Sequence, residues 1–211
     1  MTWLALVLLA GMSCGEREWK WDFDKDDPGD KPKGFYFDET GRAPDGKWRV
    51  LEDEGRKVLA QLDESRDRDR YALAVVEDSS IEHIKVSVRL KAVKGERDQA
   101  GGVMWRYRNS ENYLVARLDI SERNIRLYRF VRGHRTQFGV EEDLDVELGK
   151  WYTLRVEHEG REIKVYLNDE VVIFARDRHF TRPGRIGLWT KSDSVVYFDD
   201  LYAKNLDDDD D

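Results

Sequence analysis

The chain has 211 residues, of which 40 % are hydrophobic and 11 % aromatic, enough to form the core of one large domain. Acidic residues outnumber basic ones, and the formal net charge is −8. Because proteins that bind nucleic acid present a surplus of Lys and Arg to the phosphates, this balance excludes a nucleic-acid partner.

The N-terminus predicts export. Residues 3–12 form an apolar run that is shorter than the roughly 20 residues of a membrane-spanning helix and suits a signal peptide over residues 1–13. Cys14 follows directly and is the only cysteine, so it cannot form an internal disulfide. This arrangement resembles a bacterial lipoprotein processing site. We therefore expect a lipid on Cys14 as the only contact with a membrane, and a location at the cell envelope, in the periplasm or outside the cell.

Two features depart from the lipoprotein pattern. No Lys or Arg precedes the apolar run, and Gly11 stands where such signals usually carry Leu. An ordinary signal peptide and a misassigned start codon are therefore the alternatives.

Residues 14–33 are predicted to contain the lipidated segment and a first short strand. Trp19, Trp21 and Phe23 alternate with charged residues, as in a strand whose side chains point to opposite faces in turn. Two prolines and several Asp residues then indicate a loop.

From residue 34 to 205, alternation of apolar and polar residues predicts a single all-β domain of roughly a dozen strands. The clearest alternating segments are 84–90, 103–107, 113–119, 125–128, 152–156, 163–167, 186–191 and 196–198, with short apolar runs at 58–62 and 71–76. Residues 51–62 suit a hairpin better than a helix because they contain Gly55. Asn168-Asp169 lies between two apolar runs and predicts another hairpin. Residues 206–211 are predicted to be a disordered acidic tail.

The second half of the chain carries seven sequence words in a characteristic order. They are residues 101–107 (GGVMWRY), 112–117 (NYLVAR), 125–129 (IRLYR), 149–155 (GKWYTLR), 165–170 (VYLNDE), 184–191 (GRIGLWTK) and 197–201 (YFDDL). Together they resemble the concanavalin A-like lectin/glucanase superfamily, which includes laminin-G-like domains, and within it the 3-keto-disaccharide hydrolase-type domain. The resemblance implies an antiparallel two-sheet jelly-roll sandwich, with carbohydrate across the concave face of one sheet.

Alternation identifies the side chains that share the face opposite the core. Aromatic rings and fixed polar groups are what sugar sites require. The predicted carbohydrate-binding residues, expected on an exposed face, are Arg106, Tyr113, Arg117, Tyr128, Trp189 and Lys191. An ordinary solvated sheet face is the alternative. His134 and His158 are expected in a turn and on a strand surface, without a catalytic role.

Catalysis is the second hypothesis. The family 16 glucanase motif Glu-x-Asp-x-x-Glu has its nearest counterpart in residues 117–122, where Arg117 replaces the nucleophile, so a retaining glycosidase is excluded. The family resemblance instead implies attack on a sugar oxidised at C3. Asp119 or Asp193 would supply the base, and Lys191, Arg117 or a metal would polarise the ketone.

Two further hypotheses complete the prediction. Members of the superfamily often hold a structural Ca²⁺ between the first and last strands, and Asp22 or Asp24 with Asp199 or Asp200 would provide its oxygen ligands. A laminin-G-like module that binds protein is the third reading of function. The leading reading is glycan binding without turnover.

Overall fold

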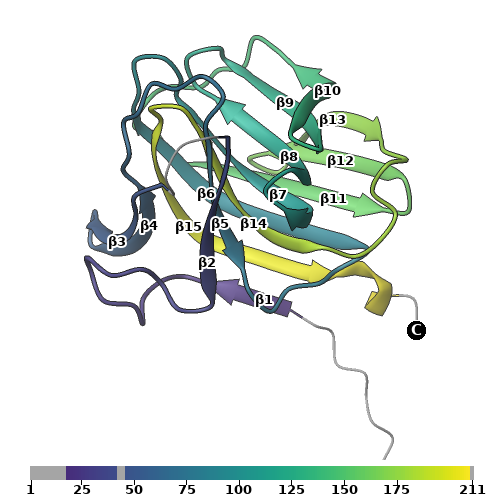
Figure 1. Ribbon diagram of the computed structural model, residues 1–211, viewed down its shortest axis with the longest axis horizontal. Helices are drawn as coiled ribbons and strands as arrows, with labels where there is room; N and C mark the ends of the chain where they lie inside the picture. The colour runs from purple at the N-terminus through teal and green to yellow at the C-terminus, as the bar shows by residue number, and fades with distance from the viewer. Residues whose placement is uncertain (1–17, 42–45, 210–211) are drawn as a thin grey trace, which may run out of the picture.

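The computed structural model describes residues 18–41 and 46–209. Within this part the protein is built from fifteen β-strands and one short 3₁₀ helix, and every strand pair in its two sheets is antiparallel (Figure 1). The predicted all-β jelly-roll sandwich is therefore confirmed. The leader over residues 1–13 and Cys14 lie outside the described residues.

The first sheet has the strand order β13-β12-β11-β6-β15-β4-β3, and β1 pairs with β15 beside this path. Its strands are β1 (Glu18–Trp21), β3 (Trp48–Asp53), β4 (Arg56–Gln61), β6 (Ile84–Lys94), β11 (Tyr152–Glu159), β12 (Glu162–Leu167), β13 (Glu170–Arg176) and β15 (Val195–Asn205).

The second sheet has the order β10-β9-β8-β7-β14-β5-β2. Its strands are β2 (Phe35–Thr40), β5 (Tyr71–Val76), β7 (Ala100–Asn109), β8 (Asn112–Asp119), β9 (Asn124–Val131), β10 (His134–Glu141) and β14 (Arg185–Lys191).

The main core lies between the two sheets and follows from the alternation in the sequence. In β6, Val86, Val88 and Leu90 are fully buried while the residues between them are partly exposed. Gly187 in β14 permits close packing within the second sheet, because a Cβ there would lie 2.3 Å from the Ala74 carbonyl oxygen.

The start of the tail has a short helical turn. Leu206–Asp209 forms the 3₁₀ helix, and the carboxylate of Asp207 lies 2.5 Å from Nδ1 of His83. Disorder of the acidic tail stays a prediction. No helix in the described ranges has both the length and the apolar composition needed to cross a membrane.

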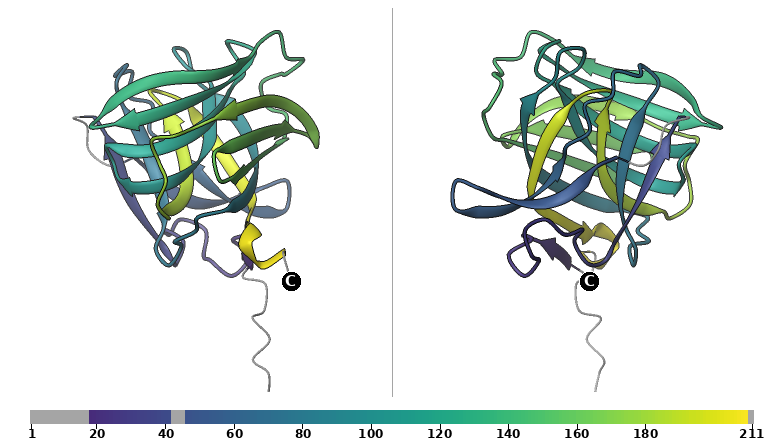
Figure 2. Two further views of the ribbon diagram at one scale, coloured as in Figure 1. Left: turned by 90° about the vertical axis from the view of Figure 1, so that its right-hand side faces the viewer. Right: turned by 60° about the vertical axis from the view of Figure 1, so that its left-hand side comes forward.

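The second sheet is strongly curved, and its strands bend visibly in both views of Figure 2. Tyr71 in β5 and Phe130 in β9 are four strands apart, which corresponds to about 19 Å in a flat sheet. Their ring centroids are nevertheless 5.1 Å apart. The face turned away from the main core is therefore concave, and opposite parts of the sheet meet across it.

Side chains of the sheet itself fill the middle of this concave face. We call them the aromatic cluster: Tyr71, Leu73, Val75, Ala100, Met104, Tyr107, Tyr113, Val115, Tyr128, Phe130 and Trp189. The cluster is closed by Thr40, whose hydroxyl hydrogen-bonds to the carbonyl of Ser110 and lies 2.9 Å from the hydroxyl of Tyr113.

Candidate functional site

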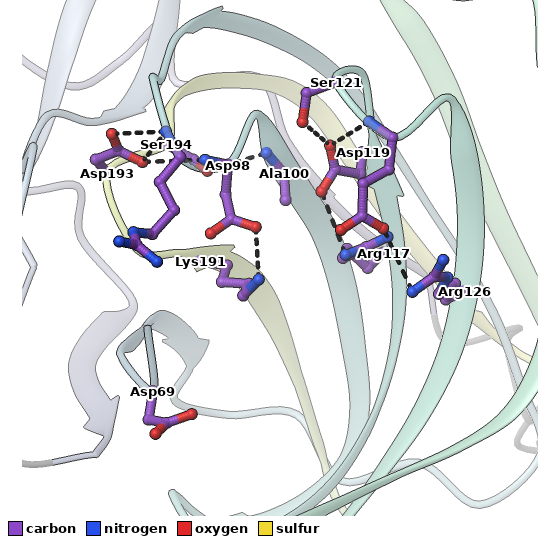
Figure 3. Close-up of polar contacts among 12 residues, drawn as sticks. Asp69, Asp98, Ala100, Arg117, Asp119, Ser121, Arg126, Lys191, Asp193 and Ser194 are labelled. Atoms are coloured by element: carbon purple, nitrogen blue, oxygen red, sulfur yellow. Dashed lines mark hydrogen bonds and ion pairs between the residues drawn. The ribbon is translucent and has the colours of Figure 1, made fainter. Parts of the chain in front are cut away.

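A cluster of charged side chains lies at one end of the concave face (Figure 3). We call it the polar cluster: Asp98, Arg117, Asp119, Glu122, Arg126 and Lys191. Its members come from β8, β9 and the end of β14, and from the loops that precede β7 and follow β8.

Arg117 is the centre of the polar cluster. It alternates with core residues along β8, so its side chain points to the concave face, where only 1 % of it is exposed. Its guanidinium lies 3.2 Å from a carboxylate oxygen of Asp119 and donates a 2.8 Å hydrogen bond to Glu122. It also lies 5.7 Å from the centroid of the Tyr128 ring. A buried charge with two acidic partners and a ring is held in one orientation.

Lys191 is the second anchored cation. Its ammonium group donates a 2.5 Å hydrogen bond to Oδ1 of Asp98, and both side chains are largely buried. Glu122 also contacts Arg126 at 3.4 Å. Burial alone would raise the pKa of Glu122, but the hydrogen bond and the charge of Arg117 outweigh it and lower the pKa to about 2.

Several buried polar atoms in the cluster form no hydrogen bond with any described residue. They are Oδ2 of Asp98, Nε of Arg117 and Nε of Arg126. Buried polar groups normally have partners, so donors and acceptors of this kind in a surface concavity point to a polar ligand or to water. A polyol supplies both donors and acceptors in its hydroxyl groups.

Three acidic members of the polar cluster lie close together, as the ligands of a metal ion do. One oxygen from each of Asp98, Asp119 and Glu122 lies within 4.8 Å of the others. Arg117 and Lys191 contact the same carboxylates, so their charge is already balanced without a cation. This arrangement suits hydroxyl groups better than a divalent ion.

The predicted calcium site stays a prediction, and the structure shows the contacts of the Asp residues named for it. Among the residues that it describes, Asp24 and Asp199 belong to no group of three close acidic side chains. Asp199 instead lies 2.8 Å from Arg56, and Asp200 contacts Arg56 and Arg89 at 2.9 and 3.1 Å. Asp22 accepts a hydrogen bond from the backbone amide of Asp24.

A groove of about 710 Å³ lies on the same face. Its lining residues are Thr40, Gly41, Asp69, Tyr71, Glu111, Arg132, Gly133, His134 and Arg135. The guanidinium of Arg135 lies over two rings of the aromatic cluster, 4.6 Å from the centroid of Tyr128 and 5.5 Å from that of Tyr71.

Tyr71 connects the groove with the polar cluster. It pairs with Lys191 across the β5–β14 ladder, and it lines the groove together with Asp69. Burial raises the pKa of Tyr71, and Arg135 opposes this change. Asp69 from the groove and Asp98 from the cluster both raise it further, so charges from the two parts act on one hydroxyl.

The predicted binding residues divide into three groups. Arg117, Tyr128 and Lys191 lie together at the polar cluster, but Arg117 and Tyr128 are buried rather than exposed as predicted. Tyr113 and Trp189 are on the predicted face, but both are fully buried in the aromatic cluster, so the expectation of exposure was wrong. Alternation identifies the face of a strand but not what covers it.

Arg106 lies elsewhere. It has a φ of 54° at an irregularity of β7, and its side chain is buried, although it was expected on an exposed face. His158 is also fully buried rather than on a strand surface, and its Nδ1 accepts a 2.9 Å hydrogen bond from Nε1 of Trp105. His134 was expected in a turn, but it is the first residue of β10, where it is exposed.

Each of the predicted catalytic residues has a structural partner. Oδ1 of Asp119 accepts hydrogen bonds from the hydroxyl of Ser121 and the backbone of Glu122. Asp193 accepts hydrogen bonds from the backbone amides of residues 96–98, and Lys191 is paired with Asp98. Sequence reasoning did not identify Asp69, Asp98 or Arg135, which lie in polar stretches without a distinguishing pattern.

Comparison of sequences finds one local similarity. The chain is 31 % identical over 90 residues to the levanase of Bacillus subtilis, and the match covers 42 % of this chain and 13 % of that enzyme. The similarity thus spans a small part of the curated relative. No family model matches the chain.

Comparison of structures finds sandwiches of the same kind. The carbohydrate-binding module CBM66 of Bacillus subtilis has a TM-score of 0.63 at 22 % identity, and the match covers 80 % of this chain and 95 % of the module. A Bacillus subtilis protein of unknown function with a galectin-like fold has a TM-score of 0.64 at 9 % identity, covering 90 % and 98 %. A putative glycosyl hydrolase of Parabacteroides distasonis has a TM-score of 0.56 at 13 % identity, covering 89 % and 94 %. These likenesses confirm the concanavalin A-like jelly-roll fold.

Proposed function

We propose that the groove and the polar cluster together bind a neutral carbohydrate without turning it over. The observation that carries the proposal is the set of buried donors and acceptors at the polar cluster that form no hydrogen bond with any described residue, namely Oδ2 of Asp98 and Nε of Arg117 and Arg126. Sugar hydroxyls satisfy both kinds, and the ring of Tyr71 forms an apolar part of the groove.

Charge balance favours a neutral ligand. The acidic residues Asp69, Asp98, Asp119 and Glu122 are matched in number by Arg117, Arg126, Arg135 and Lys191. A ligand with a net charge would leave one set uncompensated in a partly desolvated site, which costs free energy. Alternating acceptors and cationic donors suit vicinal hydroxyls.

The carboxylates favour binding over hydrolysis. A glycoside hydrolase needs a general acid whose pKa is raised. The pKa of Glu122 is about 2, and that of Asp193 is below its usual range. The alternative of elimination on a 3-keto-glycoside needs a free base, whereas Asp119 already accepts two hydrogen bonds and contacts Arg117.

The similarity to levanase suggests the first ligands to test, because the name of that enzyme gives its substrate as levan. The proposal also includes display at the bacterial cell envelope through a lipid on Cys14, which rests on the sequence pattern alone.

The test is saturation-transfer NMR of the purified protein with levan-derived and other neutral oligosaccharides, followed over time. We expect saturation transfer without product peaks, and its loss in Lys191→Met. Lys164→Met, on exposed β12, is the matched control. Absence of transfer from the whole panel, or equal transfer in both variants, would refute the proposed site. Product peaks from a 3-keto-disaccharide would instead favour the enzymatic alternative.

A further inference from the structure

Asp193 connects the strand that carries Lys191 with the loop that carries Asp98. Its side chain is buried, and its two carboxylate oxygens accept hydrogen bonds from three consecutive backbone amides. Oδ2 lies 2.9 Å from the amide nitrogen of Glu96 and 3.1 Å from that of Arg97, and Oδ1 lies 3.1 Å from that of Asp98. One side chain therefore satisfies three consecutive backbone N–H donors of the loop.

The turn that carries Asp193 is itself fixed to the sheet. The backbone amide of Ser192 donates to the carbonyl of Arg70 at 3.0 Å, and the amide of Ser194 donates to the carbonyl of Lys191 at 3.1 Å. The hydroxyl of Ser194 accepts a 2.9 Å hydrogen bond from the amide of Ala100 at the start of β7. The end of β14 is thereby held against both neighbouring strands, so Asp193 has a rigid base.

The loop held by Asp193 is unusually tight. A Cβ on Gly95 would lie 1.9 Å from the carbonyl oxygen of Asp98, so the chain folds back on itself within four residues. Glycine at position 95 permits this approach, but its flexibility does not fix the loop in one conformation. The hydrogen bonds to Asp193 supply that restraint.

The consequence concerns the polar cluster. The backbone amide of Asp98 is held by Asp193, while its Oδ1 accepts the hydrogen bond of Lys191, only two residues before Asp193. We infer that Asp193 is a positioning residue of the carbohydrate site, which sets Asp98 against Lys191 and directs Oδ2 of Asp98 toward the ligand. The ligand named in this inference rests on the proposed function. The arrangement of the side chains of Asp193, Asp98 and Lys191 does not.

The sequence predicts a different role for Asp193, that of a catalytic base. Both of its carboxylate oxygens accept hydrogen bonds from the backbone amides of the loop, and Nε of Arg66 lies 4.0 Å away. A base must have a lone pair available to the substrate. Asp193 therefore acts on the site through Asp98.

The experiment measures how fast Lys191 is acetylated by an amine-reactive ester, using mass spectrometry of the intact, folded protein. We expect slow reaction in the wild type, because the side chain of Lys191 is 15 % exposed and its ammonium group is bound to Asp98. Asp98→Asn removes the acidic partner and accelerates the reaction about tenfold, as expected for loss of a charge-assisted hydrogen bond. Asp193→Asn should produce a similar acceleration, since its amide group cannot accept all the loop hydrogen bonds. Lys164, exposed in β12, is the internal reference in every sample.

The double variant Asp98→Asn/Asp193→Asn separates positioning from general loss of stability. If Asp193 acts through Asp98, the double variant reacts no faster than Asp98→Asn alone. A wild-type rate in Asp193→Asn, or additive acceleration in the double variant, would overturn the inference. Should Asp193→Asn fail to fold, Gly95→Ala displaces the same loop from its other end. The same acceleration of Lys191 acetylation is then expected from Gly95→Ala alone, with no further acceleration when it is combined with Asp98→Asn. Titration of the same proteins with the sugars reports separately on the proposed function, because the acetylation rates need no ligand.

Discussion

The indole nitrogen of Trp105 donates a 2.9 Å hydrogen bond to Nδ1 of His158, and this bond joins the two sheets through the middle of the sandwich. Trp105 lies on β7 and His158 on β11, and both are fully buried. The ring nitrogen must be unprotonated to accept this bond. Burial, followed by the charge of Arg106, lowers the pKa of His158 to about 4.

This pair predicts how stability depends on pH. Between pH 6.5 and about 4 the unfolded chain binds a proton at His158 that the folded protein does not, so the free energy of unfolding falls as the pH falls through this range. Above pH 6.5 this effect takes nothing from the free energy of unfolding. The loss on lowering the pH to about 4 amounts to at most about 3 kcal/mol. Urea unfolding of His158→Gln should show a flatter pH dependence, whereas His134→Gln should match the wild type. Parallel curves for all three proteins would contradict this account.

Arg135 is predicted to contribute directly to sugar binding. Its guanidinium is held over Tyr71 and Tyr128 in the groove, where it can donate hydrogen bonds to a ligand. Arg135→Ala should weaken binding about tenfold, which corresponds to 1.4 kcal/mol, measured by isothermal titration calorimetry. Arg132→Ala, at another arginine that lines the groove, is the matched control. Equal losses in the two variants would indicate a general effect of charge rather than a contact of Arg135.

Trp189→Ala should reduce stability rather than act on binding alone. The ring stacks on Tyr71 with a centroid distance of 5.3 Å and is fully buried in the aromatic cluster. Removing it should lower the free energy of unfolding by about 3–5 kcal/mol in denaturant titration. A change below about 1 kcal/mol together with complete loss of sugar binding would show instead that the ring contacts the ligand.

Gly187→Ala tests the packing of β14 between its neighbours. A methyl group at this position meets the Ala74 carbonyl oxygen at 2.3 Å and Cε of Met104 at 2.5 Å, and the carbonyl belongs to the backbone of β5. We expect the free energy of unfolding to fall by about 1–3 kcal/mol. At Gly149 nothing lies within 4 Å, and only a φ of +79° opposes a side chain, so Gly149→Ala should cost less, about 1 kcal/mol. The reverse order would argue against the packing described for β14.

Local patterns predicted the fold well where one face of a strand meets the core. The alternation over residues 84–90 corresponds to β6, and Asn168 and Asp169, with φ of 48° and 70°, form the turn between β12 and β13. Positive φ at both central residues is typical of the tight hairpin turn that the pair predicts. The edge strand β10 was not predicted, because its exposed residues have no apolar period.

The site was predictable only in part. Arg117 was identified because a charged residue between apolar neighbours in a strand must lie on the opposite face, and Lys191 because alternation places it on the same face as Trp189. Asp69 and Asp98 lie in loops, and their positions depend on tertiary hydrogen bonds such as those of Asp193, which no local pattern encodes. The burial of Trp189 depends on the curvature of the whole sheet, which brings β5 to β9.

The closure of the concave face also sets the order of events when the chain folds. The hydroxyls of Thr40 and Tyr113 are 73 residues apart in sequence, and Lys191 and Asp98 are 93 residues apart. Closing such long loops costs conformational entropy before their contacts form, so nearby hairpins assemble first and the groove follows. During refolding, the capacity to bind sugar should therefore return later than the strands themselves, and isolated hairpins should have none of it.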